Sequence, residues 1–179
     1  TPSRGLGDVY KIQDQVSEHA LVPLLNWIKT KSNEGDEETL RAAVECCLAL
    51  CQATSDDPRT RARASQNMSR LLEEKDALLT LLTLLSLSHG FYTRFGALQL
   101  LVLLVEHRRL EVQDYVLTAP GGSSSVLQCL EAAPSSSTEI IRNEALLLLP
   151  QLVRDNADIQ KIVAFEGAFE RLLDIIVQE

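Results

Sequence analysis

Residues 139–179 decide the fold, and their sequence is EIIRNEALLLLPQLVRDNADIQKIVAFEGAFERLLDIIVQE. Apolar residues recur three and four positions apart in this stretch, which is the spacing of one face of an α-helix. We expect three successive amphipathic helices, at Glu139–Arg154, Ala157–Phe165 and Ala168–Gln178. The residues that we expect to form their shared core are Leu146, Leu149, Leu152, Ile162, Leu172 and Ile176.

Part of this stretch recurs earlier in the chain. Thr93–Leu101 aligns with Ile141–Leu149 at an offset of 48 residues, with Arg, Ala and three Leu residues at identical places. Further on, Gln113 aligns with Gln160 at an offset of 47. A helical period of roughly 40–47 residues is typical of armadillo and HEAT arrays. Such solenoids act through the surface that they present, so a binding surface is expected before a catalytic site.

The composition favours the same architecture. The 179 residues are 45% hydrophobic but only 4% aromatic. Leu-rich and Ala-rich sequences favour helices, whereas strands are enriched in β-branched and aromatic residues. We therefore predict an all-α, armadillo/HEAT-like right-handed helical solenoid over residues 1–179, a fragment of a longer array. It would hold three to four repeats, approximately 9–55, 58–88, 91–133 and 138–179.

Turn and cap residues place the remaining helices. The expected ranges are Val9–Thr30 (divided near Glu18), Glu37–Ala53, an Arg-rich helix after Pro58, Ala77–Leu87, Phe91–His107, Leu110–Leu117 and Val126–Ala132. Asp76 is expected to cap the helix that follows it. Thr138 followed by Glu139 suggests a capping box at the start of the last long helix. Pro150 should bend that helix without ending it.

The net charge and the placement of the cysteines disfavour several classes of function. The formal net charge is −8, which disfavours a nucleic-acid partner because phosphate binding needs a basic surface. No apolar run reaches the roughly 20 residues that span a bilayer, and no signal peptide opens the chain. The four cysteines and three histidines lack metal-ligand spacing, so we expect buried thiols in a reducing, cytosolic compartment, with no metal and no cofactor.

Catalysis is not expected from this sequence. A catalytic site needs a nucleophile, a base and an orienting group brought together, and no such set can be identified here. Gly121-Gly122-Ser123 superficially resembles a phosphate-binding loop. It lacks a preceding strand and the Gly-Lys-Ser/Thr ending of a P-loop, so we interpret it as a loop between helices.

Arg and Gln recur at matched places of the repeat, as Arg94 with Arg142 and Gln113 with Gln160. In one interpretation these side chains join neighbouring repeats by hydrogen bonds to loop carbonyls. In the other they form a polar ladder along a binding groove. The first interpretation is favoured, because position-matched recurrence in a solenoid follows from the architecture alone.

Residues 139–179 resemble the head domain of a protein family, the long coiled-coil Golgi vesicle tethers known as general vesicular transport factors. The features that carry the resemblance are Ile141-Arg142-Asn143, the Leu148-Leu149 pair, and the segments 159–166 (IQKIVAFE) and 168–176 (AFERLLDII). The match is scattered over Asp76–Ala132, and the first 75 residues match only as a plausible preceding repeat. Gly167 departs from the Asn expected at that position.

The resemblance implies an armadillo-like head that acts in ER-to-Golgi and intra-Golgi transport. It implies binding to a Rab-class GTPase and to tethering and SNARE-associated factors, and peripheral association with Golgi and transport-vesicle membranes through these partners. The full-length protein would be a homodimer, with its coiled coil outside this chain. The residues that we expect to contact partners are Arg142, Asn143, Gln160, Lys161, Glu166 and Arg171.

Two other functions stay open. An armadillo scaffold can bind extended peptides, usually through Asn and Trp residues repeated along the array. Here Trp27 is the single Trp and no Asn recurs at the repeat period, which disfavours this function. The chain could also serve as a dimerisation surface, because a solenoid end needs a polar face or a covering neighbour.

Overall fold

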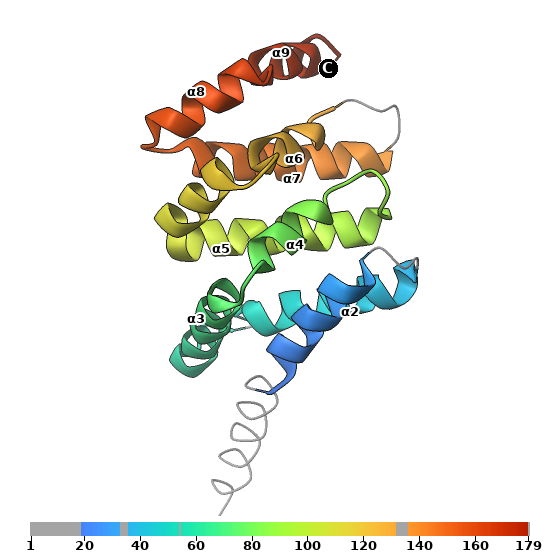
Figure 1. Ribbon diagram of the computed structural model, residues 1–179, viewed down its shortest axis with the longest axis vertical. Helices are drawn as coiled ribbons and strands as arrows, with labels where there is room; N and C mark the ends of the chain where they lie inside the picture. Colours follow the sequence, from blue (N-terminus) through green and yellow to red (C-terminus); the bar gives the residue numbers. More distant parts are fainter. Residues whose placement is uncertain (1–18, 33–35, 54, 132–135, 179) are drawn as a thin grey trace, which may run out of the picture.

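The chain folds into a stack of helices. The computed structural model describes residues 19–32, 36–53, 55–131 and 136–178, which contain helices and no strand (Figure 1). Residues 19–31 are helical. The helices that follow are α2 (Glu37–Cys51), α3 (Pro58–Glu73), α4 (Ala77–Thr83), α5 (Phe91–Thr118), α6 (Gly122–Gln128), α7 (Ser136–Val153), α8 (Ala157–Phe165) and α9 (Ala168–Gln178). The predicted all-α solenoid is confirmed.

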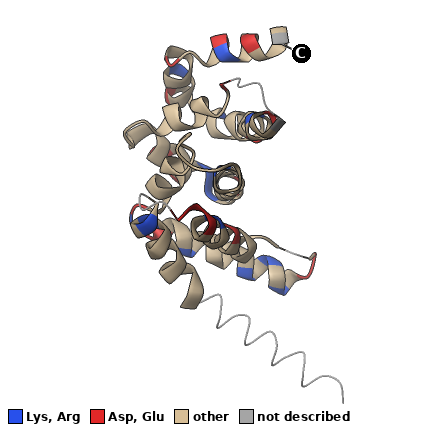
Figure 2. Cartoon of the chain, turned by 90° about the vertical axis from the view of Figure 1, so that its right-hand side faces the viewer, with Lys and Arg blue, Asp and Glu red and all other residues tan. Residues whose placement is uncertain are grey.

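A unit of three helices recurs along the stack; its first helix, here called the long helix, is followed by two others, which are shorter except α3, with 16 residues against 15 in α2. The long helices α2, α5 and α7 lie one above another, and α5 packs against both of the others (Figure 1). The shorter helices form the other side, where α4 contacts α6 and α6 contacts α8. Figure 2 shows the same stack from the side, with charged positions of both signs spread along it.

The second unit takes its first two helices from α5. Arg108 interrupts this helix with φ −140° and ψ 67°, so the element consists of a long part before Arg108 and a shorter part after it. Leucines at Leu98, Leu100 and Leu101 are fully buried on the long part. The sequence predicted separate helices at Phe91–His107 and Leu110–Leu117, and the break lies where they were expected to meet.

A left-handed residue begins the last helix of each unit. Asp76, Gly121 and Gly167 have φ values of 64°, 69° and 81°. This conformation suits Gly and, among other residues, mainly Asn and Asp, which explains how Gly can replace the Asn expected at position 167. Asp76 occupies the predicted cap position, but its side chain makes no cap hydrogen bond. Its carboxylate instead accepts a hydrogen bond from Lys29 Nζ at 2.7 Å.

Several predicted helix ends are wrong by a few residues. Helix α4 ends at Thr83 and α6 begins at Gly122, and α7 begins at Ser136, so Thr138 lies inside the helix and does not cap it. Helix α7 continues through Pro150 to Val153, as expected. The predicted helix before Glu18 lies outside the described residues.

The core prediction for the last unit is partly wrong. Leu149 and Leu152 are buried, and Leu146 and Leu172 pack against the core. Ile162 and Ile176, however, are exposed, Ile176 by 71%, and the buried residue of this turn is its neighbour, Ile175. The residues that match Ile176 in the two preceding units are Leu85 and Leu130, each 1% exposed. The helices that precede Leu85 and Leu130, α4 and α6, each contact a helix of the unit that follows, and among the described residues no unit follows α9.

Candidate protein-binding surface

The recurring Arg and Gln of the middle unit are structural. Arg94 is buried, and its Nε donates a hydrogen bond to the Leu85 carbonyl oxygen at 3.0 Å. Gln113 is 1% exposed, and its Nε2 donates to the carbonyl oxygens of Leu152 and Arg154, both at 2.8 Å. Buried polar groups of this kind satisfy main-chain acceptors at helix ends. The interpretation that these residues join neighbouring repeats is confirmed for both.

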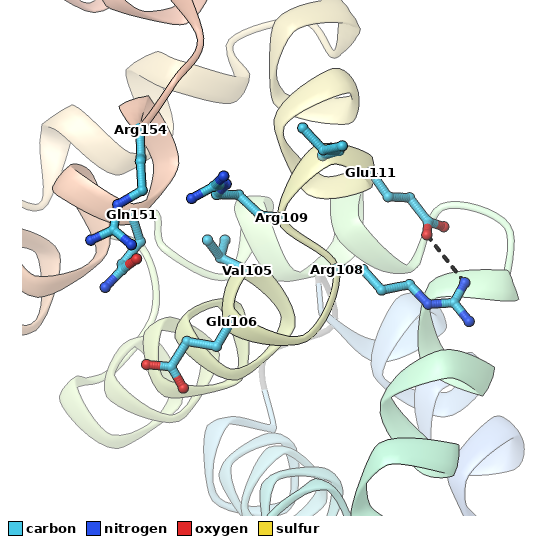
Figure 3. Close-up of a pocket in the computed structure, with 8 residues that line it drawn as sticks. Val105, Glu106, Arg108, Arg109, Glu111, Gln151 and Arg154 are labelled. Atoms are coloured by element: carbon cyan, nitrogen blue, oxygen red, sulfur yellow. Dashed lines mark hydrogen bonds and ion pairs between the residues drawn. The ribbon is translucent and has the colours of Figure 1, made fainter.

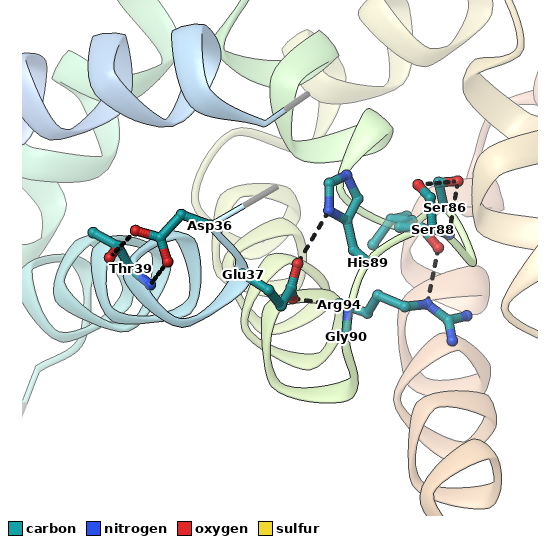
Figure 4. A network of polar contacts seen from close by, with 9 residues as sticks. Asp36, Glu37, Thr39, Ser86, Ser88, His89, Gly90 and Arg94 are labelled. Carbon is teal, nitrogen blue, oxygen red and sulfur yellow. Dashed lines mark hydrogen bonds and ion pairs between the residues drawn. The ribbon is translucent and has the colours of Figure 1, made fainter. Parts of the chain in front are cut away.

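A second polar contact joins the first two units (Figure 4). The Gly90 amide donates to Glu37 Oε1 at 2.8 Å, and His89 Nδ1 lies 3.5 Å from Glu37 Oε2. Glu37 lies in the first turn of α2, and Gly90 is the N-cap residue of α5. The carboxylate thus supplies an acceptor to an amide at the start of α5, which the helix itself leaves unsatisfied.

Two of the six predicted contact residues, Glu166 and Arg171, hold the last helices together. Ser124 Oγ donates to Glu166 Oε1 at 2.8 Å, which ties α6 to the end of α8. Arg171 Nη1 donates to the Glu166 carbonyl oxygen, and Nη2 lies 3.4 Å from Glu131 Oε1. Both side chains are half-buried, so each offers a partner only part of its surface.

Gln160 and Lys161 are exposed on α8. Gln160 Nε2 donates to the Val153 carbonyl oxygen at 2.9 Å, and Lys161 Nζ lies 3.3 Å from Asp158 Oδ1. Exposed ion pairs contribute about 0–1 kcal/mol, so Lys161 can exchange Asp158 for a carboxylate of a partner at little cost.

Arg142 and Asn143 lie near the start of α7. Asn143 is exposed, and Arg142 is half-buried. The predicted contact residues therefore come from three helices and differ in what they offer. The exposed amide and ammonium groups of Asn143, Gln160 and Lys161 are accessible, whereas the Glu166–Arg171 pair supports the fold.

A groove that the sequence did not predict lies at the break in α5 (Figure 3). It has a volume of about 640 Å³ and runs between this break and the end of α7. Arg109 Nη2 lies 3.2 Å from Asp155 Oδ2, and Arg108 Nη1 lies 3.3 Å from Glu111 Oε2. The other lining residues include Glu106, Gln151 and Arg154. Because its charges are mixed and several are already paired, the groove suits contacts with another protein better than a phosphate group.

Three of the four cysteines, Cys47, Cys51 and Cys129, are buried as expected, whereas Cys46 is exposed, and burial favours the neutral form of the three thiols. Burial raises the pKa of both Cys47 and Cys51 to about 12, and it raises the pKa of Cys129 as well. Since the thiolate is the nucleophile and the metal ligand, these side chains act as small apolar core residues. In the described part of the chain, no three His, Cys, Asp or Glu residues are grouped so that they could hold a metal ion. Within the same residues, no helix has the length and the apolar character needed to cross a membrane.

Comparison with known proteins supports the predicted resemblance. No family model matches the chain. It is 36% identical over 151 residues to Golgin candidate 6 of Arabidopsis thaliana, covering 83% of this chain and 16% of that protein. It is 41% identical over 115 residues to the general vesicular transport factor p115 of Homo sapiens, covering 64% of this chain and 11% of that protein.

The fold has a matching crystal structure. A crystal structure of Uso1 superposes with a TM-score of 0.78 at 26% identity, over 94% of this chain and 28% of that one. The chain thus spans a small part of the length of each relative. Over that part, it is a homologue of the p115, Uso1 and Golgin candidate 6 vesicular transport factors.

Proposed function

We propose that this chain is a protein-binding part of the head of a vesicle-tethering factor, acting in ER-to-Golgi and intra-Golgi transport. The observation that carries the proposal is the homology to p115 and Uso1, proteins named for vesicular and intracellular transport. A stack of helices that offers an extended surface suits this role, because solenoids act by binding partners. In the same role the protein would be peripheral on Golgi and transport-vesicle membranes, held there by its partners, with no enzymatic activity of its own.

The partners in this proposal are a Rab-class GTPase and tethering or SNARE-associated factors. The proposed contact region is the set predicted from the sequence, with most of the direct contact assigned to its exposed members, Asn143, Gln160 and Lys161. An exposed amide or ammonium group can form a hydrogen bond to a partner protein without leaving a buried polar group unsatisfied. Arg142, Glu166 and Arg171 would contribute through their half-exposed surfaces.

A pull-down with immobilised Rab-class GTPases, loaded with GDP or with a non-hydrolysable GTP analogue, tests the proposal. The full-length protein is used, because the chain covers only part of its relatives. We expect retention by the GTP form, and a loss of at least about tenfold for Lys161→Glu. Arg61→Glu, a matched charge reversal on the exposed side of α3, should bind as the unmodified protein does. Equal or absent binding in both nucleotide states would count against the proposal.

Dimerisation is the second candidate function, and the exposed apolar side chains of the last two helices favour it. Helices α8 and α9 expose large apolar side chains, namely Phe165, Phe169, Leu173, Ile176 and Val177. A second copy of the chain could cover this surface, as burial of apolar area favours association. Light scattering at high concentration would detect the dimer, and a clean monomer would exclude this role for the isolated chain.

A further inference from the structure

The three long helices share an exposed face that carries no charged residue. When α2, α5 and α7 are aligned on their buried positions, Leu40 matches Thr93 and Ile141, and Cys47 matches Leu100 and Leu148. Four exposed or half-buried positions of each helix then also match: 39, 42, 46 and 49 of α2, 92, 95, 99 and 102 of α5, and 140, 143, 147 and 150 of α7. These twelve positions, the long-helix face, hold no Asp, Glu, Lys or Arg, although 23% of the chain is charged.

Large apolar side chains are exposed on this face. Tyr92, Ile140 and Leu147 are exposed by 58%, 45% and 63%, and Phe95 and Val102 are partly buried beside them. Along each helix the face extends about 15 Å, and three helices packed 8–10 Å apart make it about 20 Å wide. Its area is therefore on the order of 300 Å², about the size of the largest apolar patch on a typical monomer, and such a patch is often functional.

The border of the face holds more acidic than basic residues, although Arg142 is half-buried beside it on α7 and Arg154 is exposed at the position that matches Glu106. Glu38 and Glu45 are exposed on α2, Glu139 begins the exposed side of α7, and Glu106 follows the face on α5. The guanidinium of Arg41 lies 5.4 Å from the centre of the Tyr92 ring and 3.7 Å from Glu45 Oε1, so its charge is already engaged.

We propose that the long-helix face binds an amphipathic helix of a partner protein, one whose apolar side is flanked by Lys or Arg. The excess of acidic residues on the border attracts basic flanks and disfavours acidic ones. The positions of the face recur at i, i+3, i+7 and i+10 along each long helix, and most of them are uncharged and apolar, so they form ridges against which the ridges of another helix pack.

A helix fits this face better than an extended peptide does. An extended peptide brings main-chain N–H and C=O groups that need partners when they are buried, whereas a helix satisfies its own. Among the twelve side chains of the face, Gln99 and Asn143 are the only amides. The inference does not rest on Rab binding, since it shares only Asn143 with the contact region proposed above.

Titration of the isotope-labelled chain with designed peptides, followed by NMR, tests the proposal. The probe is a helical peptide of about 18 residues, five turns, with Leu along one side and Lys on both flanks. We expect chemical-shift changes centred on α5 and α7 at the long-helix face. The same peptide with Glu in place of Lys should bind at least about tenfold more weakly. A peptide of equal composition made extended by proline should also bind at least about tenfold more weakly.

Matched variants of the chain locate the site. Leu147→Glu and Ile140→Glu place a charge at exposed positions of α7 and should each weaken peptide binding at least about tenfold. Leu110→Glu is the control, because Leu110 is 73% exposed on α5 but lies beyond Arg108 and off the face. Circular dichroism confirms that each variant is folded. Equal affinity of the Leu147→Glu and Leu110→Glu variants, equal binding of the acidic or extended peptide, or shifts confined to α8 and α9 would each overturn the proposal.

Discussion

Replacing Gln113 by Glu turns a buried hydrogen-bond donor into an acceptor of nearly the same shape. Gln113 Nε2 donates to two carbonyl oxygens at the end of α7, each at 2.8 Å, and the side chain is 1% exposed. A carboxylate in this place would face two carbonyl oxygens with no donor and would be desolvated. Burial without a partner raises the pKa of a carboxyl group, to about 8–9 in documented cases, so Q113E should fold with its carboxyl group protonated.

The size of the effect depends on pH. The protonated carboxyl keeps one donor, so one of the two hydrogen bonds is lost, at a cost of about 1 kcal/mol. The unfolded chain ionises with a pKa of about 4.3, so keeping the group neutral in the folded state costs about 3.7 kcal/mol at pH 7 and about 0.2 kcal/mol at pH 4. Because the folded pKa is the higher one, stability falls as pH rises above about 4. Q113E should therefore lose about 1 kcal/mol at pH 4 and about 5 kcal/mol at pH 7.

Urea unfolding at both pH values, followed by circular dichroism, measures this difference, and each variant is compared with the unmodified chain at the same pH. At pH 7 the expected loss corresponds to a fall in Tm of roughly 10–20 °C for a chain of this length. Gln160→Glu is the position-matched control, since Gln160 is exposed and should lose less than about 1 kcal/mol at either pH. If Q113E loses the same free energy at pH 4 and pH 7, Gln113 is not a buried donor to α7 and the reasoning is wrong.

Three further outcomes are expected. A thiol reagent at pH 8 should modify Cys46, which is exposed, and leave Cys47 and Cys51 intact until urea is added, because a pKa of about 12 leaves them protonated; rapid reaction of more than one thiol in the folded chain would contradict this. Asn156→Ala should lower the free energy of unfolding by about 1 kcal/mol, since Asn156 Oδ1 accepts from two amides in the first turn of α8, and Asn156→Ser should restore most of it. Gly122→Ala should cost about 1–3 kcal/mol, because a Cβ would lie 2.5 Å from a main-chain carbonyl oxygen of α5; an unchanged urea midpoint would show that α6 can shift.

Much of the fold could be predicted from the sequence because helical spacing is a local signal. The ranges of α8 and α9 were predicted without error, and the repeat of Arg94 and Gln113 indicated how the units join. Helix ends are harder to predict, because the side chain of a cap residue can bind either the helix or another part of the chain. Asp76 is an example. A cap was expected from its residue type, but its carboxylate binds Lys29, which is 47 positions away in the sequence.

Burial at the end of the stack could not be predicted from spacing. Ile175 and Ile176 are adjacent and chemically identical, yet one is buried and the other is exposed. A periodic pattern tells which residues share a side of a helix, but the neighbour that covers this side is decided by the tertiary structure. The same holds for Gln113 and Gln160, one buried between units and the other exposed on α8.

In this solenoid, the positions where the same residue type recurs are not the positions where exposure recurs. This explains why the sequence indicated the architecture more clearly than the function. Some residues recur both as the same type and in the same surroundings, such as Ala97 and Ala145, which are fully buried. On the long-helix face the matched residues differ in type, as Tyr92 and Ile140 do, and share only their exposure and their lack of charge. Shared exposure and lack of charge do not produce repeated residue types in the sequence. They can be recognised only after the three helices have been aligned on their buried positions. A binding surface of a solenoid is thus better sought among positions where a shared property, and not a shared residue, is repeated.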